Sequence, residues 1–291
     1  MEIIKKTIPR DCTIVDASDL HWDAVNCHKA GIRKMLKFVE EENAAGRPTY
    51  LNLKGDLMEA IVPGDKRYSN LTHDKNFPTP QHTADALVKL LWPVKDYILA
   101  IGDGNHELKL SGIMNFGRYM AEKLGVPHGG YTYVTEFVDA QGKRLFKTLS
   151  SHGNGRLPKG AKDPIQRKAN QQAHLKRKLE ATGFYDCVYK SMGHTHQMLV
   201  VLPTFLGELI LTTKNGQVHQ NDIPRVKQNA HYIPSEQCFF ANTGGFLKLY
   251  TPPGSGVTGY AEMLLLPPTA LGWVQMEIKN GEITDVYGVK V

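Results

Sequence analysis

Five short clusters of residues that can bind metal ions occur along this chain of 291 residues. Carboxylate, amide and imidazole groups are ligands for divalent metals, and two such cations can gather the oxygens of a phosphate ester and activate water near neutral pH. We therefore expect a two-metal site that hydrolyses phosphate esters. In chain order the clusters are Asp19-Leu20-His21, Gly55-Asp56, Gly104-Asn105-His106-Glu107, His152 and Gly193-His194-Thr195-His196.

Two of the clusters place potential ligands two residues apart. An extended backbone directs alternate side chains to the same side, so Asp19 with His21, and His194 with His196, could each aim at one small volume. Each pair is therefore expected to follow an extended stretch of chain.

The remaining clusters supply single groups. Asp56 follows a glycine, and one carboxylate can bridge two cations about 3.5–4 Å apart. Asn105 offers a neutral oxygen, and His152 offers an imidazole. His106 is expected to point elsewhere, where it could act as an acid toward the leaving oxygen or hold the phosphate.

Each cluster follows a segment with the pattern of a strand. Apolar, β-branched segments alternate with helical periodicities in the first third of the chain, which predicts an α/β sheet with its site at the carboxyl ends of the strands. We expect strands over Cys12–Ser18, Thr49–Leu53 and Tyr97–Ile101, and helices over Ala30–Glu42 and Thr83–Leu91.

The rest of the chain is predicted to form a single domain with these elements, spanning residues 1–291, with a β-rich part from about residue 197. Turns are expected at Asn215-Gly216 and Asn280-Gly281, and long loops over Pro63–Pro80 and Pro252–Gly259. The expected helices are Ser111–Leu124 and Pro164–Thr182, and the expected strands are Tyr131–Asp139, Arg144–Ser151, Cys187–Met192, Gln197–Leu202, Phe205–Thr213, Phe239–Leu249 and Gly272–Ile278.

The five motifs together closely resemble those of the calcineurin-like metallophosphoesterases, from about Asp11 to about Gly245. The resemblance implies a four-layer α-β-β-α sandwich of two mixed sheets flanked by helices, with a dinuclear site at strand ends and attack by a metal-bound hydroxide on phosphorus. It also implies that His106 is a catalytic histidine that binds no metal, and that Glu59 orients it. One metal would be held by Asp19, His21, Asp56 and His196, and the other by Asp56, Asn105, His152 and His194.

The second motif departs from that of the serine/threonine phosphoprotein phosphatases. Those enzymes resemble Gly-Asp-x-Val-Asp-Arg-Gly there, whereas this chain has Gly55-Asp56-Leu57-Met58-Glu59-Ala60-Ile61 and lacks the arginine that grips the substrate phosphate. Protein phosphatase activity is therefore not expected. Lys66 and Arg67, in the following loop, could supply substrate-binding cations instead, or they could simply be solvated.

A basic segment separates His152 from His194. From Lys143 to Lys178 there are eleven Lys or Arg residues and one acidic residue, against a net charge of +6 for the whole chain. Such a segment favours a polyanionic substrate, with a solvated helix face as the alternative. We expect nucleic acid or nucleotides, hydrolysed as phosphodiesters, and a weaker similarity to repair exonucleases and their phage relatives agrees. The candidate substrate-binding residues are Arg156, Arg167, Lys168, Lys176, Arg177 and Lys178.

Other functions stay open at this point. The alternatives are a phosphomonoesterase, a hydrolase of small pyrophosphates or diesters, or a nucleic-acid-binding module with a structural metal site. The ligand types suit Mn, which we expect, as well as Fe, Zn or Ni. No apolar stretch is typical of a secretory signal or a membrane span, and the four cysteines are scattered, which favours buried free thiols in a cytoplasmic protein. It could be phage-encoded and act inside its host cell; its oligomeric state is open.

Overall fold

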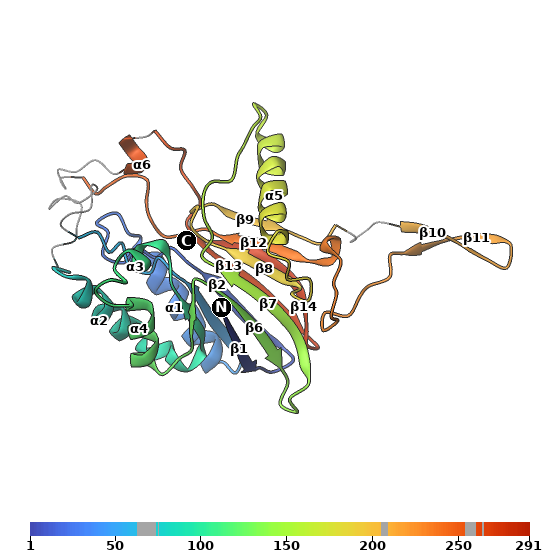
Figure 1. The fold of residues 1–291 in the computed structure, drawn as a ribbon, viewed down its shortest axis with the longest axis horizontal. Coiled ribbons are helices and arrows are strands. Elements are labelled where there is room, and N and C mark those ends of the chain that lie inside the picture. Colours follow the sequence, from blue (N-terminus) through green and yellow to red (C-terminus); the bar gives the residue numbers. More distant parts are fainter. Residues whose placement is uncertain (63–73, 75, 205–208, 254–259, 264) are drawn as a thin grey trace.

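Two six-stranded sheets face each other in the computed structural model, which describes residues 1–62, 74, 76–204, 209–253, 260–263 and 265–291 (Figure 1). The first sheet has the order β14 (Glu282–Lys290), β13 (Gly272–Lys279), β2 (Cys12–Ala17), β3 (Thr49–Lys54), β4 (Ile98–Gly102) and β5 (His128–Gly130). The second has the order β1 (Glu2–Thr7), β6 (Thr132–Val138), β7 (Arg144–Ser151), β8 (Tyr189–Met192), β12 (Phe239–Thr243) and β9 (Met198–Val201).

Both sheets are mixed, and helices cover their outer faces. Strands β2, β3, β4 and β5 run parallel, whereas β13 is antiparallel to β2. The first sheet is covered by α1 (Lys29–Ala44), α2 (Pro80–Leu91), the 3-10 helix η1 (Trp92–Tyr97) and α4 (Phe116–Leu124), and the second by α5 (Pro164–Glu180). Short helices are α3 (Asn105–Lys109), η2 (Ser235–Gln237) and α6 (Tyr260–Met263). The predicted four-layer α-β-β-α class is confirmed.

Buried side chains at helical spacing and capping residues at the first turn define the helices. In α1 the buried side chains Ile32, Met35, Leu36 and Val39 recur at helical spacing. The side chain of Asp163 accepts a hydrogen bond from the Gln166 amide at the start of α5, and Pro164 occupies its first turn. Helix α4 begins later than predicted, because Asn115 caps it by accepting from Arg118 N.

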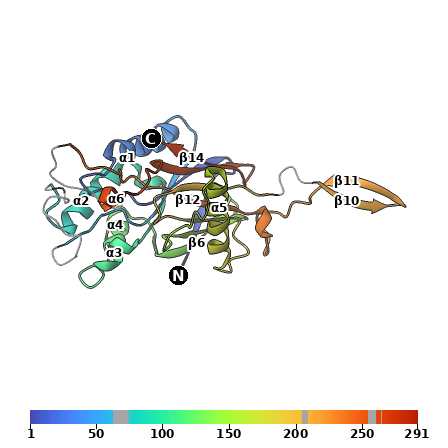
Figure 2. The same cartoon turned by 90° about the horizontal axis from the view of Figure 1, so that it is seen from above.

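Several elements were missed or misplaced by sequence reasoning. β1 and β14 lie at sheet edges. In β1 only Ile4 is buried, and in β14 the buried residues are not at alternate positions, so neither strand shows a clear alternation of apolar and polar residues. The strand expected over Phe239–Leu249 ends at Thr243. Both predicted Asn-Gly turns are confirmed, with positive φ at both residues, and Asn215-Gly216 joins β10 (Leu209–Lys214) to β11 (Gln217–Asp222) in a hairpin that projects from the body (Figures 1 and 2). Phe205 to residue 208 lie outside the described residues.

Two further expectations can be compared with the structure. All four cysteines are buried and free, as predicted. None of the helices in the described part of the chain is long and apolar enough to cross a membrane.

Candidate metal centre

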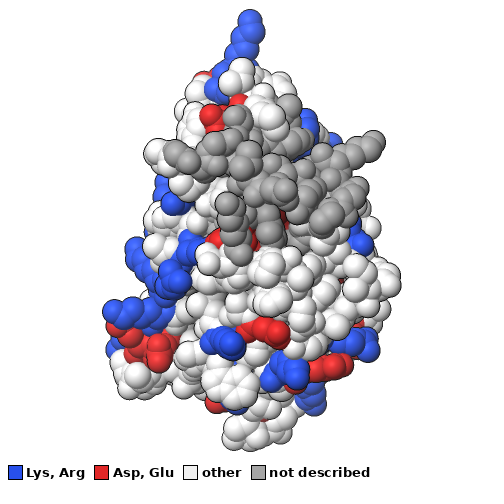
Figure 3. Space-filling view, turned by 90° about the vertical axis from the view of Figure 1, so that its left-hand side faces the viewer, with Lys and Arg blue, Asp and Glu red and all other residues white. Residues whose placement is uncertain are grey.

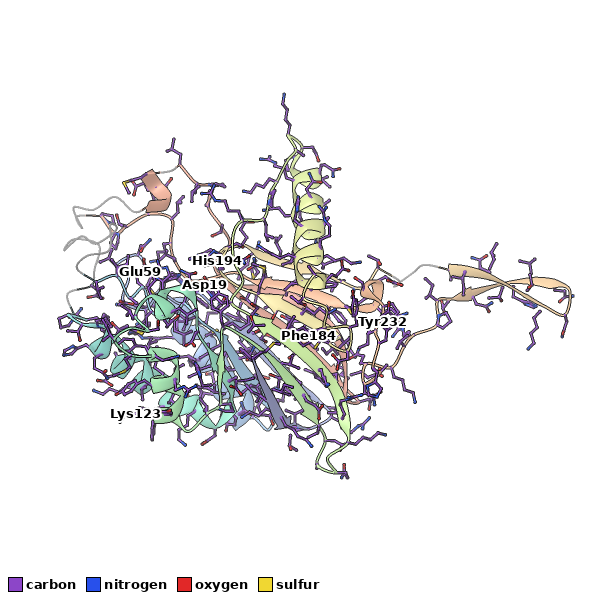
Figure 4. The ribbon with its side chains drawn as sticks, viewed as in Figure 1. Asp19, Glu59, Lys123, Phe184, His194 and Tyr232 are labelled. Carbon is purple, nitrogen blue, oxygen red and sulfur yellow. The ribbon has the colours of Figure 1, made fainter. Side chains whose placement is uncertain are left out.

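The predicted ligands gather at one end of the two sheets. Asp19 and Asp56 each follow a strand of the first sheet by two residues, and Asn105 begins α3 after β4. His152 directly follows β7 of the second sheet, and His194 lies two residues beyond β8. Figure 4 shows Asp19, Glu59 and His194 converging at this end. Each sheet thus contributes part of one site.

A first set of donor atoms comes from Asp19, His21 and His196. His196 Nε2 lies 3.4 Å from Asp19 Oδ1 and 3.3 Å from His21 Nε2. His21 Nε2 lies 3.9 Å from Asp19 Oδ1. Donors around a cation with bonds of about 2.1 Å are roughly 3.0–3.4 Å apart, so these atoms have nearly the spacing of a ligand set.

A second set comes from Asn105, His152 and His194. Asn105 Oδ1 lies 2.7 Å from His194 Nδ1 and 3.1 Å from His152 Nε2, and the two nitrogens are 3.4 Å apart. These three donors also have the mutual spacing expected around one cation.

The Asp56 carboxylate lies between the two sets. Its Oδ2 is 3.1 Å from His152 Nε2 of the second set and 4.0 Å from His21 Nε2 of the first. Its Oδ1 accepts a hydrogen bond from His106 N at 2.9 Å. One oxygen of Asp56 is therefore fixed by the backbone, and the other is directed between the two sets.

The backbone at these ligands is left-handed, which corrects the extended conformation expected from the sequence. Asp19, His21, Asp56, His194 and His196 all have φ between 46° and 70°. This region is sparsely populated by residues other than glycine and costs of order 1–3 kcal/mol each, so it persists where surrounding structure imposes it and is enriched at functional sites. The paired ligands converge because of these turns, and not because of strand alternation.

Neighbouring groups direct the ligand atoms toward the centre. Asp19 Oδ2 accepts hydrogen bonds from Ser18 Oγ and, at 2.9 Å, from His194 N, which leaves Oδ1 facing the first set. His152 Nδ1 lies 3.0 Å from the carbonyl oxygen of Lys54 and can donate to it, so Nε2 presents its lone pair.

Two buried carboxylates that sequence reasoning left without a role hold the loop around Asp56. Glu107 accepts hydrogen bonds from the amides of Gly104, Asp56, Leu57 and Met58 at 2.8–3.1 Å. Asp23 accepts from Glu59 N at 2.6 Å and from Ala60 N at 3.2 Å. The position of Glu107 inside a ligand motif could have indicated a role at the site. Nothing in the sequence distinguished Asp23 from the other acidic residues.

His106 lies beside the two sets, and with His21 and Glu59 it forms a further group whose donor atoms lie within 4.8 Å of one another. Its Nε2 is 3.9 Å from Asp56 Oδ2, and its Nδ1 contacts the main-chain oxygen of Glu59. The Glu59 carboxylate contacts His21 Nδ1 and lies 3.9 Å from His106 Nδ1, and its expected role in orienting His106 stays a prediction. The main-chain oxygen of Glu59 is thus the group that His106 Nδ1 contacts at hydrogen-bond distance in the described part of the chain.

The charged groups at the centre shift the pKa values of one another. Burial raises the pKa of Asp19, but the positive charge of His196 and a hydrogen bond from His21 outweigh it and lower the pKa to about 2. Burial lowers the pKa of His152, yet its contact with Asp56 raises it to about 9. Burial, the charge of His152 and, less strongly, that of Lys178 combine to lower the pKa of His194.

The donor atoms fit divalent cations. Asp19 Oδ1 is completely buried and has no hydrogen-bond partner among the described residues. Two pairs of imidazole nitrogens also lie within 3.4 Å of each other, an arrangement that a shared cation stabilises. A buried unpaired carboxylate oxygen is costly, so a cation in each set would satisfy what the protein leaves unpaired.

A polar network lies between the sheets beneath the centre. Lys54 Nζ is 2.7 Å from Asp16 Oδ2 and 2.7 Å from Ser191 Oγ of the second sheet. Asp16 also accepts from Asn52 Nδ2 at 2.9 Å and from Tyr189 OH at 2.6 Å. Sequence reasoning assigned no role to Asp16, because a single charge within a strand pattern carries no sign of its partner.

The predicted substrate-binding residues fall into separate groups. Lys66 and Arg67 lie outside the described residues. Arg167 and Lys168 lie in the first turns of α5, before its buried residues begin at Gln171, and α5 projects upward there (Figure 1). Figure 3 shows Lys and Arg side chains at the top of the molecule, in that direction. Arg156, Arg177 and Lys178 line one hollow, and Lys176 lies over the ring of Phe240.

Comparisons with known proteins identify no family for this chain. No protein-family model matches it, and no curated protein matches it. Among solved structures it is similar to a dimetal phosphatase from Danio rerio, with 9% sequence identity, 96% of each chain covered and a TM-score of 0.40. A likeness of this strength does not establish an activity, so function must be argued from the side chains.

Proposed function

We propose that this chain is a metal-dependent phosphoesterase with a centre of two divalent cations, and that it hydrolyses phosphodiester bonds of nucleic acid or nucleotides. The observation that carries the proposal is the position of Asp56 Oδ2 between two sets of donor atoms. A structural site needs one closed set of ligands, whereas two sets that share a carboxylate are the arrangement used to clamp a phosphate.

Each cation would have its own ligands. Asp19, His21 and His196 would hold one, Asn105, His152 and His194 the other, and Asp56 would be shared. Bound there, two cations would neutralise the phosphate oxygens and lower the pKa of water, and Mn²⁺ is the first choice for this mixture of oxygen and nitrogen donors.

His106 supplies the proton chemistry in this proposal. Its Nδ1 is directed at the carbonyl oxygen of Glu59, so its Nε2 is the atom that faces Asp56 and the centre. A proton at Nε2 can pass to the oxygen that leaves phosphorus, or it can hold a phosphate oxygen by a hydrogen bond. Because Nδ1 donates to the carbonyl oxygen of Glu59, a proton at Nε2 belongs to the imidazolium form. Burial and the charge of His21 lower the pKa of His106, so this form is a stronger acid and is less populated near neutral pH.

The preference for diesters in nucleic acid or nucleotides rests on charge beside the centre. The loop after His152 and the C-terminal half of α5 carry Arg156, Arg177 and Lys178, and the contact of Lys178 Nζ with the carbonyl oxygen of Asn154 ties the two segments together two residues from His152. Cations beside a phosphate-binding centre favour substrates that carry additional phosphates.

Turnover with added Mn²⁺ tests the proposal. The substrates are an aryl phosphate monoester, an aryl phosphate diester, a cyclic dinucleotide, and single- and double-stranded DNA. We expect hydrolysis of the diesters, with the nucleic acids turned over at lower concentration. Activity on the monoester alone would overturn the diester assignment, and no hydrolysis with Mn²⁺, Fe²⁺, Zn²⁺ or Ni²⁺ would overturn the phosphoesterase assignment.

A further inference from the structure

We infer that a hollow formed by Arg156, His174, Arg177 and Lys178 binds a second phosphate group of the substrate, while the ester to be cleaved lies at the metal centre. The inference rests on the proposed function and deepens it. It restricts the preferred substrate to molecules with at least two phosphates, such as a nucleic-acid strand.

The hollow lies between the loop that follows His152 and the C-terminal half of α5. It has a volume of about 410 Å³ and is also lined by Leu157 and Pro158. Lys178 Nζ contacts the carbonyl oxygen of Asn154, only two residues from His152. Because His152 belongs to the second donor set, this contact places Lys178 of the hollow against the segment that directly follows a proposed metal ligand.

The positive charge in the hollow is not compensated by the protein. In the described part of the chain, Arg156, Arg177 and Lys178 have no carboxylate partner. Arg177 Nη2 instead lies 3.3 Å from His174 Nδ1. Lys176 differs, because it pairs with Glu180 at 3.8 Å and lies over the ring of Phe240. The positive charge of Arg156, Arg177 and Lys178 therefore has no carboxylate counter-charge in the described part of the chain and can attract an external anion.

Packing holds the hollow in shape. Leu157 is buried, with 4% of its surface exposed, in the same core as Leu175 and Leu179 of α5. Asn170 Nδ2 donates to the carbonyl oxygen of Lys159 at 2.9 Å, which ties the loop to the helix a second time. Arg156 and Arg177 are therefore carried by two segments that are fixed to each other.

Two guanidinium groups suit the oxygens of a phosphate. Each can donate two parallel hydrogen bonds to one anion, and such contacts are stronger and more directional than those of an ammonium group. A substrate with one phosphate would occupy only the metal centre, whereas a longer one would gain the hollow as well. The hollow should therefore lower the KM for substrates with two phosphates.

The test compares two double variants that remove the same charge. The hollow variant is Arg156→Ala with Arg177→Ala. The control is Lys34→Ala with Arg118→Ala, two exposed cations on α1 and α4 that lie outside the hollow. The substrates are p-nitrophenyl esters of thymidine phosphate, at the 5′ or the 3′ position, with and without a phosphate on the other position.

We expect the hollow variant to raise KM about tenfold or more for at least one of the two-phosphate esters. KM for the one-phosphate esters, and every KM of the control variant, should change by less than about twofold. Equal effects on one- and two-phosphate esters, or an equal effect of the control variant, would overturn the inference.

A binding measurement separates this inference from the proposed function. Fluorescence anisotropy of a labelled thymidine dinucleotide with a 5′-phosphate, in EDTA, requires no hydrolysis. The hollow variant should bind it about tenfold more weakly than the wild type and the control variant do. Unchanged binding would overturn the inference even if the protein hydrolyses diesters. If the wild type hydrolyses none of the substrates but the binding difference between the variants is observed, only the proposed function is overturned.

Discussion

Lys54 Nζ lies 2.7 Å from Asp16 Oδ2 in the space between the two sheets, and neither side chain is exposed to solvent. The same lysine carries the carbonyl oxygen next to His152 Nδ1 and immediately precedes Gly55-Asp56. Its contact with Ser191 reaches the strand that leads to His194. The buried ion pair thus connects the strands that position ligands from both sheets.

Replacing Lys54 by methionine should strongly destabilise the fold. The Asp16 carboxylate would remain buried without its cation, and breaking a buried pair in this way typically costs about 3–5 kcal/mol. The measurement is the free energy of unfolding from urea denaturation. Lys37→Met is the matched control, because Lys37 pairs with Glu41 on the surface at 3.3 Å and should contribute less than about 1 kcal/mol. Equal losses in the two variants would contradict a special role for the buried pair.

Glu107→Gln should weaken metal binding without unfolding the protein. The four amides that now face carboxylate oxygens would meet one amide oxygen and one NH₂ group, so the loop of Asp56 would shift. Supporting groups of this kind typically contribute about 10- to 100-fold to metal affinity. Titration calorimetry with Mn²⁺ measures the effect, and Glu122→Gln, on the exposed side of α4, serves as the control. An unchanged affinity would show that Glu107 does not position Asp56.

His106→Ala should slow turnover and leave metal binding intact. Loss of a general acid typically costs about 10²- to 10⁴-fold in kcat, and the loss should be larger for an alkyl leaving group than for p-nitrophenolate, which departs without a proton. The measurement is kcat for both kinds of diester together with Mn²⁺ affinity. If kcat falls equally for the two leaving groups, His106 holds the phosphate and does not donate the proton.

The buried cysteines should react slowly in the folded protein. Burial raises the pKa of the Cys12, Cys27 and Cys187 thiols to about 12, and the thiolate is the reactive form. Because these values exceed the unfolded value of 9.0, burial of the thiols stabilises the fold fully below pH 9, and the contribution declines as pH rises toward 12. A thiol reagent at pH 8 should label the protein rapidly only in denaturant. Rapid labelling of the native protein would contradict this packing.

The sequence allowed prediction of the central elements because both faces of those strands are covered. Segments rich in apolar and β-branched residues mark β2, β3 and β4, and the helical spacing of Ile32, Met35 and Val39 marks α1. Edge strands such as β1 and β14 carry no such signal, since their exposed positions accept polar side chains.

Residue type and order indicated which side chains meet at the centre, but not how they are held. The left-handed backbone at Asp19 and His194 depends on contacts between segments far apart in the chain, such as that of His194 N with Asp19 Oδ2. The roles of Asp16, Asp23 and Glu107 also depend on partners in other elements. Spacing along the sequence contains no information about such pairs.

The number of Mn²⁺ ions bound per chain tests the central claim most directly, through equilibrium dialysis of the wild type and of Asp56→Asn. Two sets of donors that share Asp56 predict two ions for the wild type, and at least one ion lost or bound far more weakly in the variant, because a neutral amide cannot bridge two cations as a carboxylate does. One ion or none in the wild type, or two equally tight ions in both proteins, would contradict the two-cation centre.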